Sequence, residues 1–348
     1  MQYTIKDIAL LAGVSRGTVD RIMHKRGPVS KTTYDKVMGV LNEIDYSPNL
    51  IGRSLKKMNK KHRIAVFLPD HKIVKYWEEV AIGIKKGAKE FQSFGISVEE
   101  TYYSSDDSKV FQAQAQAILE SSPEAVLMAP ILSNESTSFI KECIKKGILV
   151  VYINTPLSNV ESAFYIGTQR EQSGRVAANI FDNFIEDGKL LILNIKVDIE
   201  NSIHMERKEI GFREYFKEKG VENHSIESVS VLKEKIKLEQ IVKEFVLSDN
   251  KRKGIFVSGS HVHTIASIVK ENKLNVFLVG YDLISENIEY LKQGVIHFLI
   301  NEKRINQGYL GIKNLAQYFL FDKEMESSSY LPVDIVSREN YKMYLTIP

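Results

Sequence analysis

Apolar residues recur at helical spacing along the first 45 residues, and this pattern predicts three short helices. Thr4 followed by Asp7 is typical of a capping box, so we expect the first helix to begin at Ile5. Gly13 can take the positive φ that ends this helix, and Ser15 can cap the second helix. The apolar faces of these two helices are expected to comprise Ile8, Ala9 and Leu11, and then Val19, Ile22 and Met23.

A third helix is predicted from the cap at Ser30 to about Asp45. Its apolar face would comprise Val37, Leu41 and Ile44. Helices as short as the first two are not stable alone in water, and the third supplies the surface on which they pack. A helix, a tight glycine turn and a capped helix together predict a helix-turn-helix.

From Arg63 the hydrophobic pattern changes to short runs rich in Val, Ile and aromatic residues, which predict strands with helical stretches between them. The expected strands are RIAVFLP, SVEETYY, AVLMAP, LVVYIN and AFYIG, followed by KLLILNI, ESVSVL, KGIFVSG, NVFLVGYD and VIHFLIN. This βαβ alternation predicts two parallel sheets in series. Ligands of such sheets bind at the carboxyl ends of the strands, which places a cleft between the two units.

Charge is distributed unevenly along the 348 residues, a length that suits two or three domains. Residues 1–63 contain 13 Lys and Arg against 5 Asp and Glu, a net charge of +8. The remainder contains 34 against 39, a net charge of −5. A small basic head on a mildly acidic body suggests that the head binds a polyanion.

The single cysteine, Cys143, excludes an internal disulfide and fits a reducing compartment. Helical spacing places it with Phe139 and Ile144, which predicts a buried thiol. No apolar run reaches the roughly 20 residues of a membrane span. The start of the chain lacks the pattern of a signal peptide, so we expect a cytoplasmic protein.

The exposed face of the second helix carries the candidate base contacts. In a helix-turn-helix the start of this helix enters the major groove, where Arg16, Gly17 and Arg21 would lie. An arginine fork on guanine O6 and N7 contributes about 1–3 kcal/mol of discrimination. Short hydroxyl side chains near helix starts suit phosphate oxygens; they are Ser15, Thr18 and Ser30. The alternative is a solvated basic helix on a small packing module.

The stretch TIKDIALLAGVSRGTVDRIMHKRGPVSKTTYDKVMGVLNEIDYSPNLIGRSL closely resembles the headpiece of the LacI/GalR family of bacterial transcription regulators. The resemblance implies that Arg16, Gly17 and Arg21 read bases, although Gly17 departs from the usual larger side chain. The set of DNA contacts it implies is Thr4, Ser15, Arg16, Gly17, Thr18, Arg21, Ser30, Asn49 and Leu55.

The segment YSPNLIGRSLKK resembles the hinge of that family. The resemblance implies a short helix from Asn49 that forms when two subunits sit on DNA, with Leu55 wedged into the minor groove. Gly52 stands where alanine is usual and costs that helix about 1 kcal/mol. The alternative is a plain flexible linker.

The region 62–348 resembles the periplasmic sugar-binding-protein fold. The implied fold class is therefore α/β, with an all-α helix-turn-helix headpiece and two-lobed, doubly wound parallel sheets. The implied effector contacts are Tyr76, Trp77, Asn154, Arg207, Asp282 and Glu302. The register leaves Lys208 as the alternative to Arg207 and Asn301 as the neighbour of Glu302.

Chemically this set suits a sugar or polyol, because aromatic rings stack on C–H faces while carboxylates and amides bind hydroxyls. Trp77 has a plain core residue as its alternative interpretation. His261 and His263 form an H-x-H pair, but no further zinc ligands are evident nearby, so loop histidines that touch the effector are favoured over a metal site. No cofactor is expected.

The expected domains are 1–47 for the helix-turn-helix, 48–61 for the hinge, and 62–348 for the effector domain. In the last, the N-lobe would comprise 62–169 and 302–327, and the C-lobe 170–301 and 328–348. Chain crossings between the lobes are expected near Gln169, near Glu302 and near Ser327–Tyr330.

The leading hypothesis is a homodimeric transcriptional regulator, with repression as the expected mode, that reads a pseudo-palindromic double-stranded operator and answers a small sugar-like effector. An activator or dual regulator that answers a non-sugar metabolite is the alternative. An enzyme fused to a DNA-binding domain lacks support, because the chain shows no nucleophile elbow, phosphate-binding glycine loop or metal-ligand spacing. A solute-binding protein is opposed by the headpiece and by the missing export signal.

Overall fold

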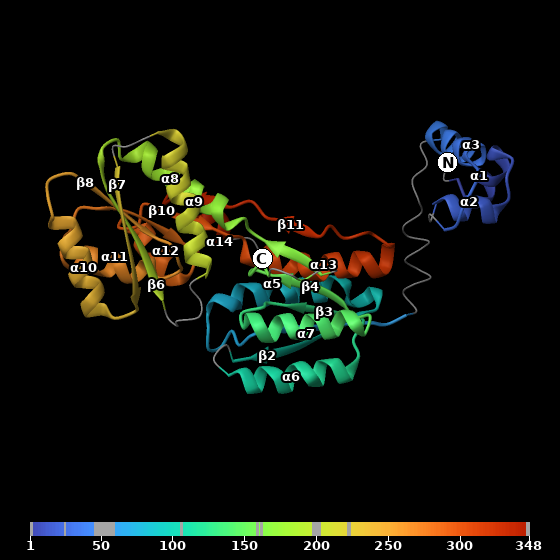
Figure 1. Cartoon of the computed structure of the whole chain (residues 1–348), viewed down its shortest axis with the longest axis horizontal. Helices are drawn as coiled ribbons and strands as arrows, with labels where there is room; N and C mark the ends of the chain where they lie inside the picture. Colours follow the sequence, from blue (N-terminus) through green and yellow to red (C-terminus); the bar gives the residue numbers. More distant parts are fainter. Residues whose placement is uncertain are drawn as a thin grey trace. The chain divides into compact units, whose positions relative to one another are not determined.

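The computed structural model describes residues 3–23, 26–44, 60–104, 107–157, 160, 163–196, 203–220 and 224–345. Two compact units divide the chain, Met1–Asn59, which we call the headpiece, and Lys60–Pro348. In the headpiece the described residues form α1 (Ile5–Ala12), α2 (Arg16–Met23) and α3 (Lys31–Glu43) (Figure 1). The three helices predicted from the sequence are confirmed.

Local hydrogen bonds explain where the first helix begins and ends. The Thr4 backbone N–H donates to Asp7 Oδ2 at 2.8 Å, and the Asp7 N–H donates to Thr4 Oγ1 at 3.4 Å. Gly13 then adopts the left-handed conformation with φ of 63°, as the turn requires. Both features confirm the predicted capping box and glycine turn.

The headpiece core consists of Ile8, Ala9, Ala12, Val19, Ile22 and Val37. The prediction that Leu11 is buried is wrong, because its side chain is 54% exposed. Ala12 lies between Ile8 and Ala9 around the helix circumference, whereas Leu11 falls on the flank of this stripe. Leu11 was predicted to be buried because it is apolar, although its position around the helix lies outside the buried stripe.

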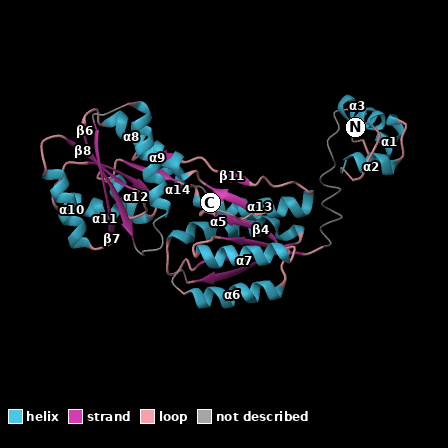
Figure 2. Cartoon of the chain, viewed as in Figure 1, coloured by secondary structure: helices cyan, strands magenta, loops and turns pink. Residues whose placement is uncertain are grey.

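The larger unit contains two lobes, each built on a six-stranded sheet (Figure 2). The sheet of the first lobe has the order β11-β5-β4-β3-β1-β2, and all its described pairings are parallel. Its strands are β1 (His62–Pro69), β2 (Ile96–Tyr103), β3 (Ala125–Met128), β4 (Leu149–Ile153), β5 (Phe164–Gly167) and β11 (Ser328–Tyr330).

Helices cover both faces of the first sheet, and the side chains of β1 alternate between them. Ile64, Val66 and Leu68 pack toward α5 (Tyr76–Phe91) and α13 (Arg304–Phe321). Ala65 and Phe67 pack toward the other face, which is covered by α6 (Ser108–Ser121) and α7 (Ser133–Lys145). A 3-10 turn, η1 (Gln92–Phe94), extends α5.

The second lobe repeats this order as β12-β10-β9-β8-β6-β7, with β12 antiparallel to β10. Its strands are β6 (Gly188–Lys196), β7 (His224–Leu232), β8 (Arg252–Val257), β9 (Phe277–Tyr281), β10 (Phe298–Asn301) and β12 (Asp334–Val336). One face of the sheet bears α8 (Arg170–Phe184) and α9 (Ile203–Lys219). The other bears α10 (Lys235–Leu247), α11 (Val262–Glu271) and α12 (Ser285–Lys292), and α14 (Lys342–Leu345) ends the described chain.

The ten strands predicted from the sequence correspond to β1 through β10, so the α/β class with two parallel-dominant sheets is confirmed. Among the described strands the chain crosses between the sheets after β5, after β10 and after β11. The third crossing was expected near Ser327–Tyr330, with residues from 328 onward in the second lobe, but residues 328–330 form β11, which pairs with β5 of the first sheet. The crossing therefore follows Tyr330, and these three residues belong to the first lobe.

Cys143 is fully buried in α7 beside Phe139, as predicted. Burial raises the pKa of its thiol to about 12, so the thiol stays protonated and unreactive in the native chain. None of the helices in the described residues combines the length and the apolar character that a membrane crossing needs.

Each lobe contains a pair of helices that approach closely through glycines. A Cβ on Gly83 of α5 would overlap the carbonyl of Ile305 in α13. In the second lobe, a Cβ on Gly174 of α8 would overlap the carbonyl of Lys208 in α9. These helix pairs carry polar residues between the lobes, so the glycines set the spacing of those residues.

We expect Gly83→Ala to lower the free energy of unfolding of the first lobe by about 1–3 kcal/mol, because a methyl group there forces two helix backbones apart. Urea unfolding followed through the emission of Trp77, the single tryptophan, measures this directly. Lys85→Ala, on the exposed face of the same helix, is the control and should change the value by less than about 0.5 kcal/mol. Equal stability of Gly83→Ala and the wild type would show that the helix spacing is not constrained.

Candidate functional site

Two residues in equivalent positions of the two lobes organise the space between the sheets. Asn154 follows β4 with φ of 68°, and Asp282 follows β9 with φ of 74°. The N–H of Asn154 donates to Ile166 O at 3.1 Å, and that of Asp282 donates to Ile300 O at 3.0 Å. Asn and Asp tolerate the left-handed conformation better than most residues do. The left-handed conformation turns both side chains away from the direction of the strands, at the carboxyl ends of the sheets.

A cavity of about 520 Å³ lies between the lobes at these strand ends. Its walls contain five of the six predicted effector residues, namely Tyr76, Trp77, Asn154, Asp282 and Glu302. Apolar side chains such as Ile73, Ile131 and Met205 contribute much of the remaining surface. A largely apolar cavity of this size with a few convergent polar groups is typical of a small-molecule site.

The aromatic pair lies at the start of α5. The rings of Tyr76 and Trp77 meet edge to face, with centroids 5.0 Å apart, and Asn154 Nδ2 donates to the hydroxyl of Tyr76. Burial raises the pKa of Tyr76, so its hydroxyl stays protonated at neutral pH. Trp77 is only 4% exposed and belongs to the core of the first lobe. It therefore combines the two alternatives left open by the sequence, because it packs in the core and also lines the cavity.

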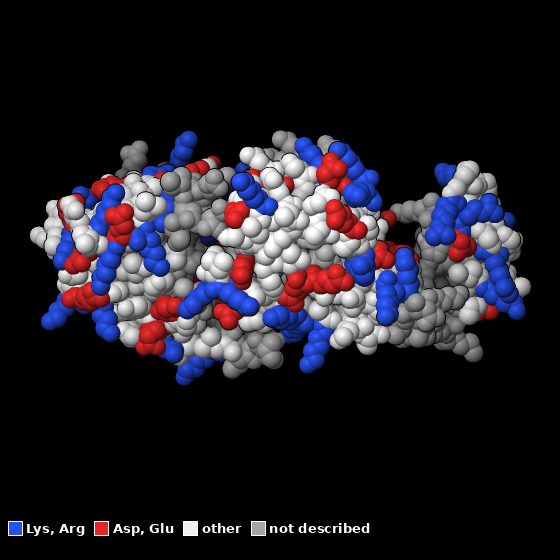
Figure 3. Space-filling view, turned by 90° about the horizontal axis from the view of Figure 1, so that it is seen from below, with Lys and Arg blue, Asp and Glu red and all other residues white. Residues whose placement is uncertain are grey.

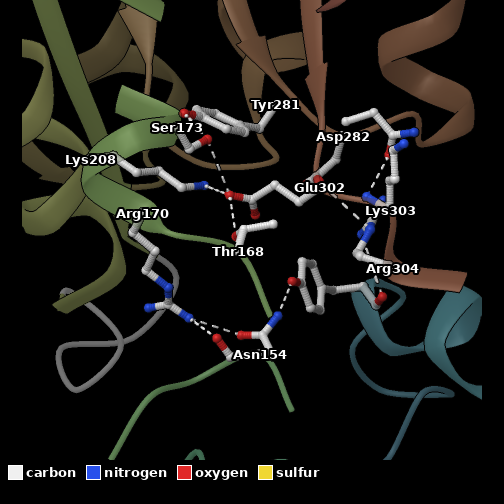
Figure 4. Close-up of polar contacts among 12 residues, drawn as sticks. Asn154, Thr168, Arg170, Ser173, Lys208, Tyr281, Asp282, Glu302, Lys303 and Arg304 are labelled. Atoms are coloured by element: carbon white, nitrogen blue, oxygen red, sulfur yellow. Dashed lines mark hydrogen bonds and ion pairs between the residues drawn. The ribbon is translucent and has the colours of Figure 1, made fainter. Parts of the chain in front are cut away.

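Glu302 and Lys208 form a buried ion pair, with Lys208 Nζ 3.0 Å from Glu302 Oε1 (Figure 4). Thr168 and Ser173 donate hydroxyl hydrogen bonds to the same oxygen at 3.4 and 3.5 Å. Burial alone would raise the pKa of the Glu302 carboxyl, but Lys208 and Arg170 hold it below its usual value. The carboxylate is thus ionised in the folded chain, and the stabilisation it gives is lost as pH falls through that lowered pKa.

Arg304, at the start of α13, is a second buried cation behind the cavity. Its Nε lies 3.0 Å from Glu79 Oε2 of the first lobe and 3.6 Å from Asp282 Oδ1 of the second lobe. The guanidinium also stacks over Tyr76, 4.6 Å from the ring centroid. A single side chain therefore connects the aromatic pair of one lobe with the predicted sugar-binding aspartate of the other.

Arg170 begins α8 and projects toward Asn154 (Figure 4). Its Nη2 donates to Asn154 O at 2.6 Å and to Asn154 Oδ1 at 3.1 Å. Burial lowers the pKa of this guanidinium, although nearby Glu302 opposes the effect. The contact fixes the Asn154 amide with its Nδ2 toward Tyr76.

Arg207 is the one predicted effector residue that does not line the cavity. Its side chain is 51% exposed and pairs with Glu171 at 2.6 Å, beside a smaller depression outside the site. The next residue of α9, Lys208, faces the cavity instead. The register that counts back from Phe212 is the one the structure adopts, because a helix turns by roughly 100° per residue and cannot direct both neighbours inward.

Sequence reasoning missed Arg170, Arg304, Thr168 and Ser173 as contacts of the site. Arg304 lies two residues after Glu302 at a predicted chain crossing, and this position could have indicated that Arg304 belongs to the site. Arg170 and Ser173 lie one turn apart on α8 and gave none beyond helical spacing. His261 and His263 line the cavity, but they lie at the start of α11 and in its first turn rather than in a loop. No group of three His, Cys, Asp or Glu side chains within the described ranges is placed to hold a metal ion.

The headpiece presents a separate polar face on α2. Ser15, Arg16, Gly17 and Arg21 are exposed, and Arg21 Nε donates to Gly17 O at 3.2 Å. A Cβ on Gly17 would meet only Ser15 Oγ, at 3.8 Å, so packing does not require glycine there. Figure 3 shows Lys and Arg predominating on the visible headpiece face, while both charge signs mix over the larger unit.

The hydroxyl groups predicted to touch phosphate serve as local caps. Thr4 caps α1, while Ser15 Oγ accepts from the Thr18 N–H at 3.1 Å and Ser30 Oγ accepts from the Thr33 N–H at 3.3 Å. The first turn of each of these helices contains exposed residues, such as Lys6, Arg16 and Lys31. Asn49 and Leu55 lie outside the described residues.

Comparison with known proteins identifies both parts of the chain. Residues 4–49 match the bacterial regulatory proteins of the lacI family, and residues 64–323 match the periplasmic binding protein domain. The sucrose operon repressor of Escherichia coli is 30% identical over 127 residues, which is 36% of this chain and 36% of that protein. The ribose operon repressor of Lactococcus lactis is 25% identical and covers 97% of this chain and 98% of its own.

Solved structures agree with this match. A candidate LacI transcriptional regulator from Bacteroides fragilis superposes with a TM-score of 0.73 at 28% identity, covering 82% of this chain and 100% of its own. A solute-binding protein from Burkholderia graminis, in complex with D-arabinose, has a TM-score of 0.70 at 15% identity and covers 82% and 98%. The second likeness shows the shared fold alone.

Lys208→Met should lower the free energy of unfolding by about 3–5 kcal/mol, because it leaves Glu302 buried without its ammonium partner. Arg207→Met, at the adjacent position, removes only an exposed ion pair and should cost less than about 1 kcal/mol. Urea unfolding at pH 7 measures both variants. A similar loss in the two would contradict the assignment of Lys208 to the interior of the site.

Proposed function

The chain belongs to the lacI family of bacterial regulatory proteins and carries a periplasmic-binding-protein domain C-terminal to its headpiece, and on this premise we propose that it is a sequence-specific, DNA-binding regulator of transcription. Its operator affinity responds to a small sugar-like effector bound between the two lobes. The observation that carries this proposal is that one chain joins an exposed, arginine-bearing helix-turn-helix face and a cavity between two lobes in which a few polar groups converge.

The DNA-binding part of the proposal rests on the exposed face of α2. Arg16 and Arg21 are separated by roughly 1.4 helical turns. Gly17 between them has no side chain to cover the backbone. With no side chain at Gly17, base discrimination falls mainly on the two arginines. The starts of α1, α2 and α3, whose first turns contain exposed residues, suit phosphate oxygens and would fix the register of the headpiece.

The effector part rests on the cavity and on the connections between the lobes. Arg304 pairs with Glu79 of the first lobe and with Asp282 of the second lobe. Lys75 of the first lobe pairs with Glu286 of the second lobe at 3.3 Å. A ligand that hydrogen-bonds to Asn154 and Asp282 alters the relative pose of the lobes, as a hinge motion. The names of the related sucrose and ribose operon repressors favour a sugar or polyol as that ligand.

The remaining parts of the proposal follow from family membership. We expect a homodimer in the cytoplasm that reads a pseudo-palindromic operator and acts as a repressor without enzymatic activity. Asn49 would begin a hinge helix, and Leu55 would enter the minor groove at the centre of the operator. The lobe pose would decide whether that segment can form on DNA.

Arg16→Ala should relax the preference for one or two symmetric operator positions, because it removes the guanidinium that faces a base edge. Selection of binding sites from a random duplex library, followed by sequencing, measures the preference. The expected loss of discrimination is about 1–3 kcal/mol at those positions.

The matched control is Arg26→Ala, which removes an exposed guanidinium outside α2. It should weaken binding to all duplexes alike and reduce the salt dependence, as a phosphate contact does. A selection profile of Arg16→Ala identical to that of the wild type would reject base reading by Arg16. Failure of the wild type to prefer any duplex would reject the proposed function itself.

A further inference from the structure

Among the described residues, the charged groups that line the cavity include both carboxylates and cations that pair with each other and lysines without a carboxylate partner. Each of the three carboxylates has a cation nearby: Glu302 has Lys208 at 3.0 Å, Glu286 has Lys75 at 3.3 Å, and Asp282 has Arg304 at 3.6 Å. Five Lys and Arg line the cavity, namely Lys75, Arg170, Lys196, Lys208 and Lys233. Lys196 and Lys233 have no carboxylate partner among the described residues, and both belong to the wall formed by the second lobe.

The chain path places these two lysines next to each other. Lys196 is the last residue of β6, and Lys233 follows directly after β7, the neighbouring parallel strand. The Lys233 N–H donates to Lys196 O at 3.0 Å, which joins the two residues at the carboxyl edge of the sheet. We call these two residues, together with His261 and His263, the basic wall.

His261 completes the basic wall at the start of α11, directly after the β8 loop. Its Nδ1 lies 3.3 Å from Lys233 Nζ, and its ring centroid is 5.7 Å from that of His263. Burial lowers the pKa of His261 to about 4, with further lowering by Lys233 and His263. The imidazole is therefore neutral at pH 7, and its Nδ1 accepts from the ammonium while its Nε2–H remains a donor.

His263 has the opposite arrangement of donor and acceptor. Its Nδ1 lies 3.0 Å from Asn287 Oδ1, which can only accept, so Nδ1 carries the proton and Nε2 is left over. Glu286 is the carboxylate that acts on this ring, and it is already paired with Lys75. Among the residues that the structure describes, no carboxylate receives the two ammonium groups and the imidazole N–H that the basic wall offers.

A neutral sugar lacks the negative charge that the cations of the basic wall would attract. Sugar hydroxyls can accept from one ammonium, but like charges that line one cavity wall repel one another unless an anion lies between them. An oxyanion accepts several charge-assisted hydrogen bonds at once, as phosphates and carboxylates do. The cavity also extends to the rings of Tyr76 and Trp77, which provide apolar surface for a carbon skeleton.

We propose that the effector of this cavity is a polyol that bears an oxyanion, either a phosphate ester or a carboxylate. Lys196, Lys233 and His261 bind the anionic group, and Tyr76 and Trp77 contact the carbon skeleton. This inference rests on the proposed function, since it names the ligand class of the same cavity.

Trp77 provides the test, because it is the single tryptophan of the chain and lies in the cavity wall. The full-length protein is titrated with D-ribose, D-arabinose, D-allose and D-glucose, each as the free sugar, the aldonate and the terminal phosphate ester, and with inorganic phosphate. Ionic strength is held constant with KCl, because exposed lysines attract any anion at low salt. The change in Trp77 emission gives the dissociation constant of each probe.

We expect the best probe to be anionic and to bind at least about ten-fold more tightly than its neutral parent, as charge-assisted hydrogen bonds allow. Comparison of the aldonate with the phosphate ester identifies which oxyanion is preferred. Lys233→Met should weaken the anionic probe about ten-fold and leave the neutral sugars within about two-fold. His261→Gln, which keeps an amide N–H, is a second variant with the same expected direction.

Lys235→Met is the matched control. Lys235 lies two residues beyond Lys233, does not line the cavity, and pairs with Glu271 at 3.0 Å. Its loss should leave every dissociation constant within about two-fold.

Neutral sugars that bind as tightly as their anionic forms would overturn the inference and leave the proposed function standing. An unchanged affinity of the anionic probe in both Lys233→Met and His261→Gln would likewise reject the basic wall as its site. If no probe alters Trp77 emission and none alters operator binding, the sugar-like effector is rejected as well.

Discussion

A buried guanidinium must be matched by carboxylates, and this requirement at Arg304 connects the two lobes. The side chain is fully buried, and the cost of removing its charge from water is offset only where Glu79 and Asp282 both approach it. Glu79 belongs to the first lobe and Asp282 to the second, so the arrangement depends on one relative pose of the two sheets. The stacking of the guanidinium over Tyr76 extends this dependence to the aromatic wall of the cavity.

The repeated topology of the lobes explains why polar groups converge at this point. Asn154 and Asp282 follow the fourth strand of their respective sheets, both with positive φ, and both donate their N–H groups to the fifth strand. Glycine contacts then fix the helices that carry the other groups, because Gly83 holds α5 against α13 and Gly174 holds α8 against α9. The cavity is therefore a product of two copies of one sheet architecture rather than of any single loop.

The sequence predicted the elements well, because strand composition, helix caps and the glycine turn are local signals. It also predicted that Tyr76, Trp77, Asn154, Asp282 and Glu302 would line one cavity, which the resemblance to a known fold implied. It erred where a side chain's direction depended on one residue of register, as at Leu11 and at Arg207. It assigned residues 328–330 to the second lobe because ESSSY has the composition of a linker, although they complete the first sheet.

The partners of the site were harder to predict than its lining. Arg304 contacts Glu79, which lies 225 residues earlier in the chain, and Arg170 contacts Asn154 across a chain crossing. Such pairs arise from tertiary packing, and no local pattern in one sequence encodes them. The ionisation of Glu302 likewise depends on Lys208 from α9 and on Arg170 from α8, and neither is close to it in sequence.

The central claim is that occupancy of the cavity and binding of DNA are linked through the relative pose of the lobes. Linkage requires that a ligand change operator affinity by the same factor by which the operator changes ligand affinity. The most direct measurement is the pair of dissociation constants, operator with and without saturating ligand and ligand with and without operator, for a compound that alters Trp77 emission. Linkage through the lobe pose predicts two equal factors of about 5–150. An operator dissociation constant that stays the same at saturating ligand would contradict it.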